Sequence, residues 1–85
     1  MDKEQVKEQL KSLIEDVMPD LEEVKLDTDM KQEYGVNSVS LIRLIVACEE
    51  AFAVEFTDYE LDLDSYDTFG DLAASITEKL AKKDA

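Results

Sequence analysis

Hydrophobic residues recur at helical spacing over three stretches of the chain. In residues 2–18 the apolar side chains lie three and four positions apart and form one stripe: Val6, Leu10, Leu13, Ile14 and Val17. Such spacing predicts an amphipathic helix. Asp2 followed by Gln5 is a capping pattern for its start. Pro19 ends the helix, because the residue before a proline avoids helical backbone angles.

The second stretch, SVSLIRLIVACEEAF at residues 38–52, predicts a helix with two apolar sides. At about 100° per residue, one side carries the core candidates Leu41, Leu44, Ile45, Cys48 and Phe52. A second stripe, made of Val39, Ile42 and Val46, occupies a side that is usually polar when a helix packs only inward. We expect Ile42 to join the core, and Val39 and Val46 to form an exposed docking patch.

The last third of the chain predicts a short helix followed by a long one. Thr57 with Glu60 is a capping pattern for the short helix, which covers Tyr59, Leu61 and Leu63. Thr68 with Asp71 is a second capping pattern. The stripe after it extends to about residue 81 and comprises Phe69, Leu72, Ala73, Ile76 and Leu80. The lysines near the end favour the negative end of the helix dipole: Lys79, Lys82 and Lys83.

Residues 19–37 have no sustained hydrophobic period. The apolar residues Leu21, Val24 and Leu26 stand among acidic ones, and Met30 and Tyr34 follow. We expect an ordered loop that packs across the helices. The predicted fold is therefore an all-α single domain, residues 1–85, with a long first loop and a short third helix.

The composition of the chain argues against several classes of function. The 85 residues include 22 Asp and Glu against 9 Lys and Arg, for a net charge of −13, which argues against nucleic-acid binding. No apolar run approaches the roughly 20 residues of a membrane span, and the start of the chain lacks the apolar region of a signal peptide. A single Cys cannot form an internal disulfide, so a reducing compartment, the cytoplasm, is expected.

Catalysis by this chain alone is not expected. There is no His and one Cys, so no zinc site, Ser–His pair or Cys–His pair can form within it. Candidate calcium loops starting at Asp27, Asp58 and Asp62 lack the required Gly and Glu, so no metal site is predicted. Cys48 shares the apolar stripe and is expected to be a core residue, with an acidic neighbour that raises its pKa.

Acidic residues are unevenly distributed. Between Arg43 and Lys79 there is no basic residue, and there are ten acidic ones: Glu49, Glu50, Glu55, Asp58, Glu60, Asp62, Asp64, Asp67, Asp71 and Glu78. Such a run indicates either solvated polar faces or an acidic surface that steers basic partners toward the domain.

The segment Gly35-Val36-Asn37-Ser38-Val39 precedes the second predicted helix. A Gly permits a tight turn, and Asn or Ser can cap the helix that follows. The hydroxyl of Ser38 lies at a positive helix end, which tolerates a phosphate. The ordinary role of such a serine is a helix cap. Local chemistry leaves both roles open.

The sequence resembles the acyl and peptidyl carrier proteins. Their signature, G-x-D-S-[LV] followed by an apolar run and Glu-Glu before Phe, corresponds to GVNSVSLIRLIVACEEAF here. The resemblance extends over nearly the whole chain, from the helix ended by Pro19 to Thr68-Phe69-Gly70-Asp71-Leu72 at the start of the last helix. It implies a four-helix carrier bundle. The absence of a flanking linker favours a freestanding protein, although a domain cut from a larger synthase would look similar, and a monomer is the default expectation.

The resemblance also implies how such a carrier works. A phosphopantetheinyl transferase attaches phosphopantetheine to Ser38, which matches the family's serine, whereas Ser40 does not. The arm then holds an acyl or aminoacyl group as a thioester. An acyl- or aminoacyl-loading ligase and downstream synthase enzymes of a biosynthetic pathway are the further partners implied.

Two departures from the family pattern concern partner recognition. Asn37 stands where the family usually has Asp, and Arg43 stands at a docking position that is often acidic. The expected docking residues are Asn37, Val39, Arg43, Val46 and Glu50. The alternative function is an unmodified acidic helical module that binds a basic partner, in which Ser38 is only a cap.

Overall fold

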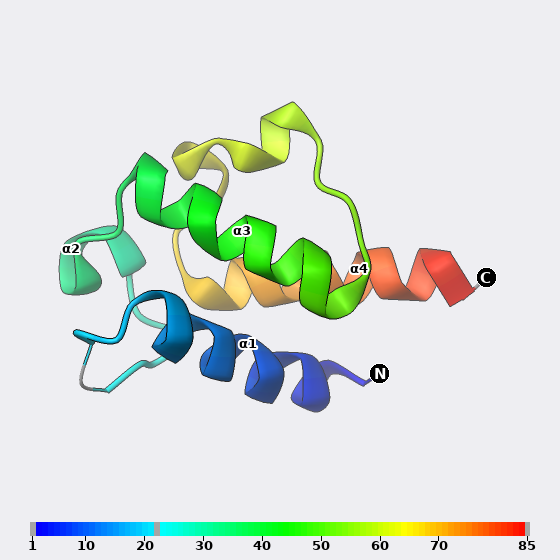
Figure 1. Ribbon diagram of the computed structural model, residues 1–85, viewed down its shortest axis with the longest axis horizontal. Coiled ribbons are helices and arrows are strands. Elements are labelled where there is room, and N and C mark those ends of the chain that lie inside the picture. The colour runs from blue at the N-terminus through cyan, green and yellow to red at the C-terminus, as the bar shows by residue number, and fades with distance from the viewer. Residues whose placement is uncertain (1, 22, 85) are drawn as a thin grey trace.

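The computed structural model describes residues 2–21 and 23–84, which form α-helices and 3₁₀ turns joined by loops. Three of the helices are long: α1 (Lys3–Val17), α3 (Ser38–Phe52) and α4 (Phe69–Asp84). α1 packs against both α3 and α4 (Figure 1). In Figure 1, the start of α1 and the end of α4 lie at one end of the molecule, and the start of α3 lies at the opposite end. The predicted all-α class is confirmed.

Helix α1 begins and ends where its sequence signals predict. Asp2 Oδ1 accepts a hydrogen bond from the Gln5 N–H at 2.9 Å, and Gln5 Oε1 accepts from the Asp2 N–H at 3.0 Å. This reciprocal pair satisfies two N–H groups that have no partner within the helix. The helix stops at Val17, two residues before Pro19.

The core lies between the three long helices and consists mostly of residues from the predicted stripes. Its fully buried side chains on these helices are Val6, Leu10 and Ile14 of α1, Leu41, Leu44, Ile45 and Cys48 of α3, and Phe69, Leu72, Ala73 and Ile76 of α4. Met30, outside the stripes, is fully buried as well, whereas Leu13, Val17 and Leu80 of the stripes are only partly buried. Phe52 is also buried. The expectation for Ile42 is wrong, because this side chain is 43% exposed. Leu41, Leu44 and Ile45 already occupy the inward side of that turn.

The first connection contains a short helix that the hydrophobic pattern does not predict, α2 (Met30–Tyr34). Asp29 caps it, since Asp29 Oδ1 accepts from the N–H groups of Lys31 at 2.9 Å and Gln32 at 3.0 Å. Gly35 ends it in the left-handed conformation, with φ of 63°. The two local signals were present in the sequence, but a helix of five residues is too short to show a period.

The same connection packs across the helices, as predicted. Val24 is buried, and the Gly70 N–H donates to the Leu26 carbonyl at 2.7 Å. A Cβ at position 70 would lie 3.0 Å from that carbonyl oxygen, a tight contact, so glycine favours the close approach of this loop to α4. A further bond, from the Met30 N–H to the Asp67 carbonyl, ties α2 to the residues that precede α4.

The predicted short third helix is instead two 3₁₀ turns, η1 (Asp58–Leu61) and η2 (Leu63–Ser65). The pairing of Thr57 with Glu60 is present, since Glu60 Oε1 accepts from the Thr57 N–H at 2.9 Å. Asp62 divides the segment because its backbone is extended, at φ −80° and ψ 127°, and its side chain caps η2. One continuous helix is therefore not formed.

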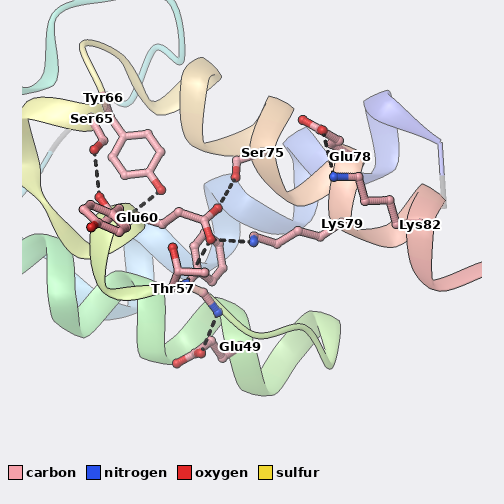
Figure 2. A network of polar contacts seen from close by, with 11 residues as sticks. Glu49, Thr57, Glu60, Ser65, Tyr66, Ser75, Glu78, Lys79 and Lys82 are labelled. Carbon is pink, nitrogen blue, oxygen red and sulfur yellow. Dashed lines mark hydrogen bonds and ion pairs between the residues drawn. The ribbon is translucent and has the colours of Figure 1, made fainter.

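Polar contacts attach these turns to α4 (Figure 2). Lys79 Nζ donates to Glu60 Oε1 at 2.8 Å, and the Ser75 hydroxyl donates to Glu60 Oε2 at 3.2 Å. The Tyr66 hydroxyl donates to the Glu60 carbonyl at 2.8 Å. Helix α4 continues to Asp84, so its last turn contains Lys82 and Lys83 but not Lys79. The role expected for Lys79 at the negative end of the helix is therefore wrong, and Lys79 binds a distant carboxylate instead.

Candidate functional site

Two backbone hydrogen bonds hold the chain immediately before α3. The N–H groups of Gly35 and Val36 both donate to the Met30 carbonyl. Val36 is buried, with 4% of its surface exposed. The connection from α2 to α3 is therefore anchored one residue before the cap of α3.

Asn37, and not Ser38, is the cap of α3. Asn37 Oδ1 accepts from the Ser40 N–H at 3.0 Å and from the Ser40 hydroxyl at 3.3 Å. The Asn37 carbonyl accepts the first helical bond, from the Leu41 N–H at 2.9 Å. Ser38 is the first residue of the helix, its side chain is exposed, and the capping role that such a serine ordinarily has is taken by its neighbour.

The surroundings of Ser38 favour a negatively charged group. Ser38 lies at the positive end of a 15-residue helix, whose first turn has no acidic residue. The backbone N–H groups of the first helical residues have no carbonyl partner within the helix. The turn before it is also open at Gly35, where nothing lies within 4 Å of the place a Cβ would take. A phosphate ester on the exposed Ser38 side chain would lie at this positive helix end.

The exposed side of α3 begins directly after Ser38. Val39 is 62% exposed, Ile42 43% and Val46 46%, which makes them three of the large apolar side chains on the molecular surface. The charged residues on this side, Arg43 and Glu50, are exposed as well. The ion pairs of the described residues, Lys31–Asp67, Lys79–Glu60 and Lys82–Glu78, do not include Arg43.

The comparison with family models decides the family. A model described as the phosphopantetheine attachment site matches residues 8–76. The chain belongs to this family of phosphopantetheine carriers. Phosphopantetheine is therefore its prosthetic group, and the carrier presents bound groups to other enzymes instead of catalysing a reaction itself.

Curated relatives agree with the family assignment. The carrier is 29% identical to the acyl carrier protein of Coprothermobacter proteolyticus over 62 residues, which are 72% of this chain and 76% of that protein. It is 33% identical to the acyl carrier protein of Phytoplasma mali over 49 residues, 58% of each chain. No solved structure matched this chain. As a phosphopantetheine carrier, it interacts in general with transferases and synthases.

Two surface hollows of the carrier have linings that do not include Ser38. One, of about 380 Å³, is lined by Ala53, Val54, Glu55, Lys79, Lys82 and Lys83, and another, of about 250 Å³, by Lys3, Lys7, Leu26, Asp27, Thr68, Gly70 and Asp71. In the described ranges 2–21 and 23–84, no group of three or more His, Cys, Asp or Glu residues could hold a metal ion. None of the helices built from these residues has the length and apolar character that crossing a bilayer requires.

Cys48 is not part of the site. Its side chain is fully buried on the inward side of α3, as the apolar stripe predicts. Burial, and secondly the negative charge of Glu49, raises the pKa of the Cys48 thiol to about 12. A thiol with that pKa carries almost no thiolate near neutral pH and is a poor nucleophile.

The sequence did not show that Asn37 is the helix cap and that Ser38 is the first helical residue. Asn and Ser are nearly equal as helix caps, so composition at these two positions could not select one of them. The spacing offered no better signal, because either residue can accept from an N–H two or three positions later. The structure settles the question, because Asn37 follows the buried Val36 with an extended backbone, at φ −116° and ψ −179°, and lies at the cap.

Proposed function

We propose that Ser38 is the residue to which phosphopantetheine is attached. The observation that carries this proposal is an exposed hydroxyl at the first position of α3, next to a cap formed by Asn37. Ser38 Oγ would attack the phosphorus atom of coenzyme A that bears the pantetheine. The bond from that phosphorus to adenosine 3′,5′-bisphosphate breaks, and the hydroxyl proton passes to a base of the transferase.

The carrier then holds its cargo on the arm. The thiol of the attached arm binds an acyl or aminoacyl group as a thioester, which the carrier delivers to enzymes of a biosynthetic pathway. A phosphopantetheinyl transferase, an acyl- or aminoacyl-loading ligase and downstream synthase enzymes are the proposed partners. The cytoplasm is the proposed location, since the single cysteine is a buried free thiol and the arm also needs a reduced thiol.

Docking is proposed to use the exposed side of α3. Val39, Arg43 and Val46 lie in the turns directly after Ser38, so a partner that reaches the arm must pass over them. The valines would be buried on docking, and Arg43 would pair with a carboxylate of the partner. Glu50 extends this surface toward the end of the helix. Asn37 borders the surface on the other side of Ser38.

The alternative is an unmodified module that binds a basic partner. A specific observation favours keeping it: acidic side chains are exposed through the segment between α3 and α4, at Glu55, Asp58, Asp62, Asp64 and Asp67. Such a surface attracts basic partners at a distance. In this alternative no transferase would act on the chain.

Intact mass spectrometry separates the two functions. The purified apo chain is incubated with coenzyme A, magnesium and a phosphopantetheinyl transferase of broad specificity. The carrier function predicts that the chain gains the mass of one phosphopantetheine. A chain whose mass stays unchanged, while a control carrier protein in the same reaction is converted, would support the unmodified module.

A further inference from the structure

We propose that Asn37 is a positioning residue for the attachment reaction. By capping α3, Asn37 keeps the turn that bears Ser38 folded. The Ser38 hydroxyl is then not needed for a capping hydrogen bond. The inference rests on the proposed function, because it concerns the placement of the proposed acceptor hydroxyl.

The turn around Ser38 is held between two buried anchors. Val36 precedes it with 4% of its surface exposed, and Leu41 follows with none. Between these anchors Ser38 and Val39 are exposed, and Ser40 is only half-buried. Packing therefore contributes little to the first turn of α3, and its hydrogen bonds must hold it in place.

Asn37 supplies the side-chain hydrogen bonds that close this turn. Its Oδ1 accepts from both the backbone N–H and the hydroxyl of Ser40. The Asn37 backbone is extended, at φ −116° and ψ −179°, as is usual for a residue at the N-cap. One side-chain atom thus links the residue before Ser38 to the residue two positions after it.

A cap at position 37 also determines which groups remain available. If Ser38 were the cap, its hydroxyl would accept from an N–H group of the first turn, and the helix would begin at Val39. With Asn37 as the cap, Ser38 becomes the first helical residue and its hydroxyl faces solvent. Asn37 therefore sets both the register of α3 and the freedom of the proposed nucleophile.

The loss of this cap should reduce the fraction of molecules that a transferase can recognise. An ordinary cap is worth about a fivefold change in a local helix–coil equilibrium. When only a fraction of the molecules is competent to bind, the apparent affinity falls by that fraction. Fivefold is the upper limit of this effect, reached when the turn is only marginally folded, so we expect Asn37→Ala to raise the KM for the carrier by up to about fivefold while kcat at saturation stays nearly constant.

The experiment measures KM and kcat for the carrier with a broad-specificity phosphopantetheinyl transferase and coenzyme A. Asn37→Ala removes the cap, whereas Asn37→Ser and Asn37→Asp retain a good capping oxygen. Asp2→Ala is the matched control, since it removes the cap of α1 and leaves α3 untouched. Amide hydrogen exchange of Ser40 in the apo proteins gives a second readout that does not depend on the transferase.

The inference predicts a raised KM and faster Ser40 exchange in Asn37→Ala alone, with both restored in Asn37→Ser. An equal rise of KM in Asn37→Ala and Asp2→Ala would mean that general destabilisation causes the rise, and it would overturn the inference. A loss in Asn37→Ser as large as in Asn37→Ala would also overturn it, because the amide would then act by direct contact. Failure of the wild-type chain to be modified at Ser38 would instead overturn the proposed function itself.

Discussion

Lys79 Nζ lies 2.8 Å from Glu60 Oε1 and links α4 to η1 across 19 residues of sequence. The lysine also lies over the Phe56 ring, 4.8 Å from its centroid. No residue of η1 or η2 is fully buried, so this ion pair adds to the packing of the partly buried Leu61 and Leu63 in holding the segment against the helices. It is shielded from solvent more than the exposed pair Lys82–Glu78 of α4.

Replacing Glu60 should therefore cost more than replacing Glu78. Glu60→Gln keeps the size of the side chain and an acceptor for the Thr57 N–H, but removes the charge that Lys79 binds. We expect a loss of roughly 1–2 kcal/mol in the free energy of unfolding. The matched variant Glu78→Gln should change it by less than about 0.5 kcal/mol. Urea denaturation of both variants checks this, and equal effects would contradict the assigned role of Glu60.

The contribution of Glu60 should disappear in acid. Partial burial alone would raise the pKa of Glu60, but hydrogen bonds from Lys79 and Thr57 and the charge of Lys79 outweigh it and lower the pKa from 4.5 to about 2. A lowered pKa stabilises the folded state above the unfolded value and loses that effect as pH falls toward the folded value. The stability difference between wild type and Glu60→Gln should be full above about pH 4.5 and should shrink between pH 4.5 and 2. A difference that stays constant over this range would show that the ion pair does not contribute.

Cys48 should be unreactive while the chain is folded. Its thiol is fully buried, and burial followed by the charge of Glu49 raises its pKa to about 12. A disulfide reagent at pH 8 should therefore titrate no thiol in the folded apo chain and one thiol in denaturant. After attachment of the arm, the folded chain should react with one equivalent. Rapid reaction of the folded apo chain would contradict the buried position of Cys48.

Excess negative charge should lower the stability of the domain at low ionic strength. With 22 acidic and 9 basic residues, the folded chain carries a net charge of −13 in a small volume. We expect its Tm to rise with moderate salt or millimolar magnesium, which screen this repulsion. The double variant Glu55→Gln/Asp64→Asn should have a higher Tm at low salt and a smaller salt response. A Tm that salt and magnesium leave unchanged would mean that the charges are too dispersed to repel strongly.

Arg43 should affect recognition without affecting the fold. Its side chain is exposed on the same side of α3 as Val39 and Val46. Arg43→Glu should weaken recognition by the native loading enzyme, since like charges facing each other across an interface cost up to several kcal/mol. Loading rates are measured against carrier concentration, with Lys11→Glu on α1 as the matched charge reversal. Equal loading of the two variants would remove Arg43 from the docking surface.

The long helices were predictable because their signals are local. Capping residues and hydrophobic periods lie within one helix, and so the bounds of α3 and the buried set Leu41, Leu44, Ile45 and Cys48 follow from residues 38–52 alone. For the site, the motif indicates Ser38 and the structure shows Ser38 exposed at the first position of α3, while the attachment role of Ser38 stays a prediction.

Features that depend on distant residues were not predictable. The partner of Lys79 is a carboxylate on a segment whose path is fixed only after folding. The division of η1 from η2 was missed for a local reason, because it depends on the extended backbone of Asp62, which the hydrophobic pattern does not show. Ile42 is exposed because neighbouring side chains fill the inward side of α3, and periodicity does not show how much of a helix the other elements cover.

The attachment of phosphopantetheine to Ser38 is tested most directly by locating the modified residue. Cleavage after Lys31 and Arg43 releases one peptide that contains both Ser38 and Ser40, and fragmentation between them assigns the arm. Ser38→Ala should abolish modification and leave the Tm nearly unchanged, since Asn37 provides the cap. Ser40→Ala should still be modified, because the backbone N–H at position 40 continues to donate to Asn37. The arm on Ser38 in the wild-type peptide is the predicted result, and an arm on Ser40, or modification of Ser38→Ala, would contradict the account.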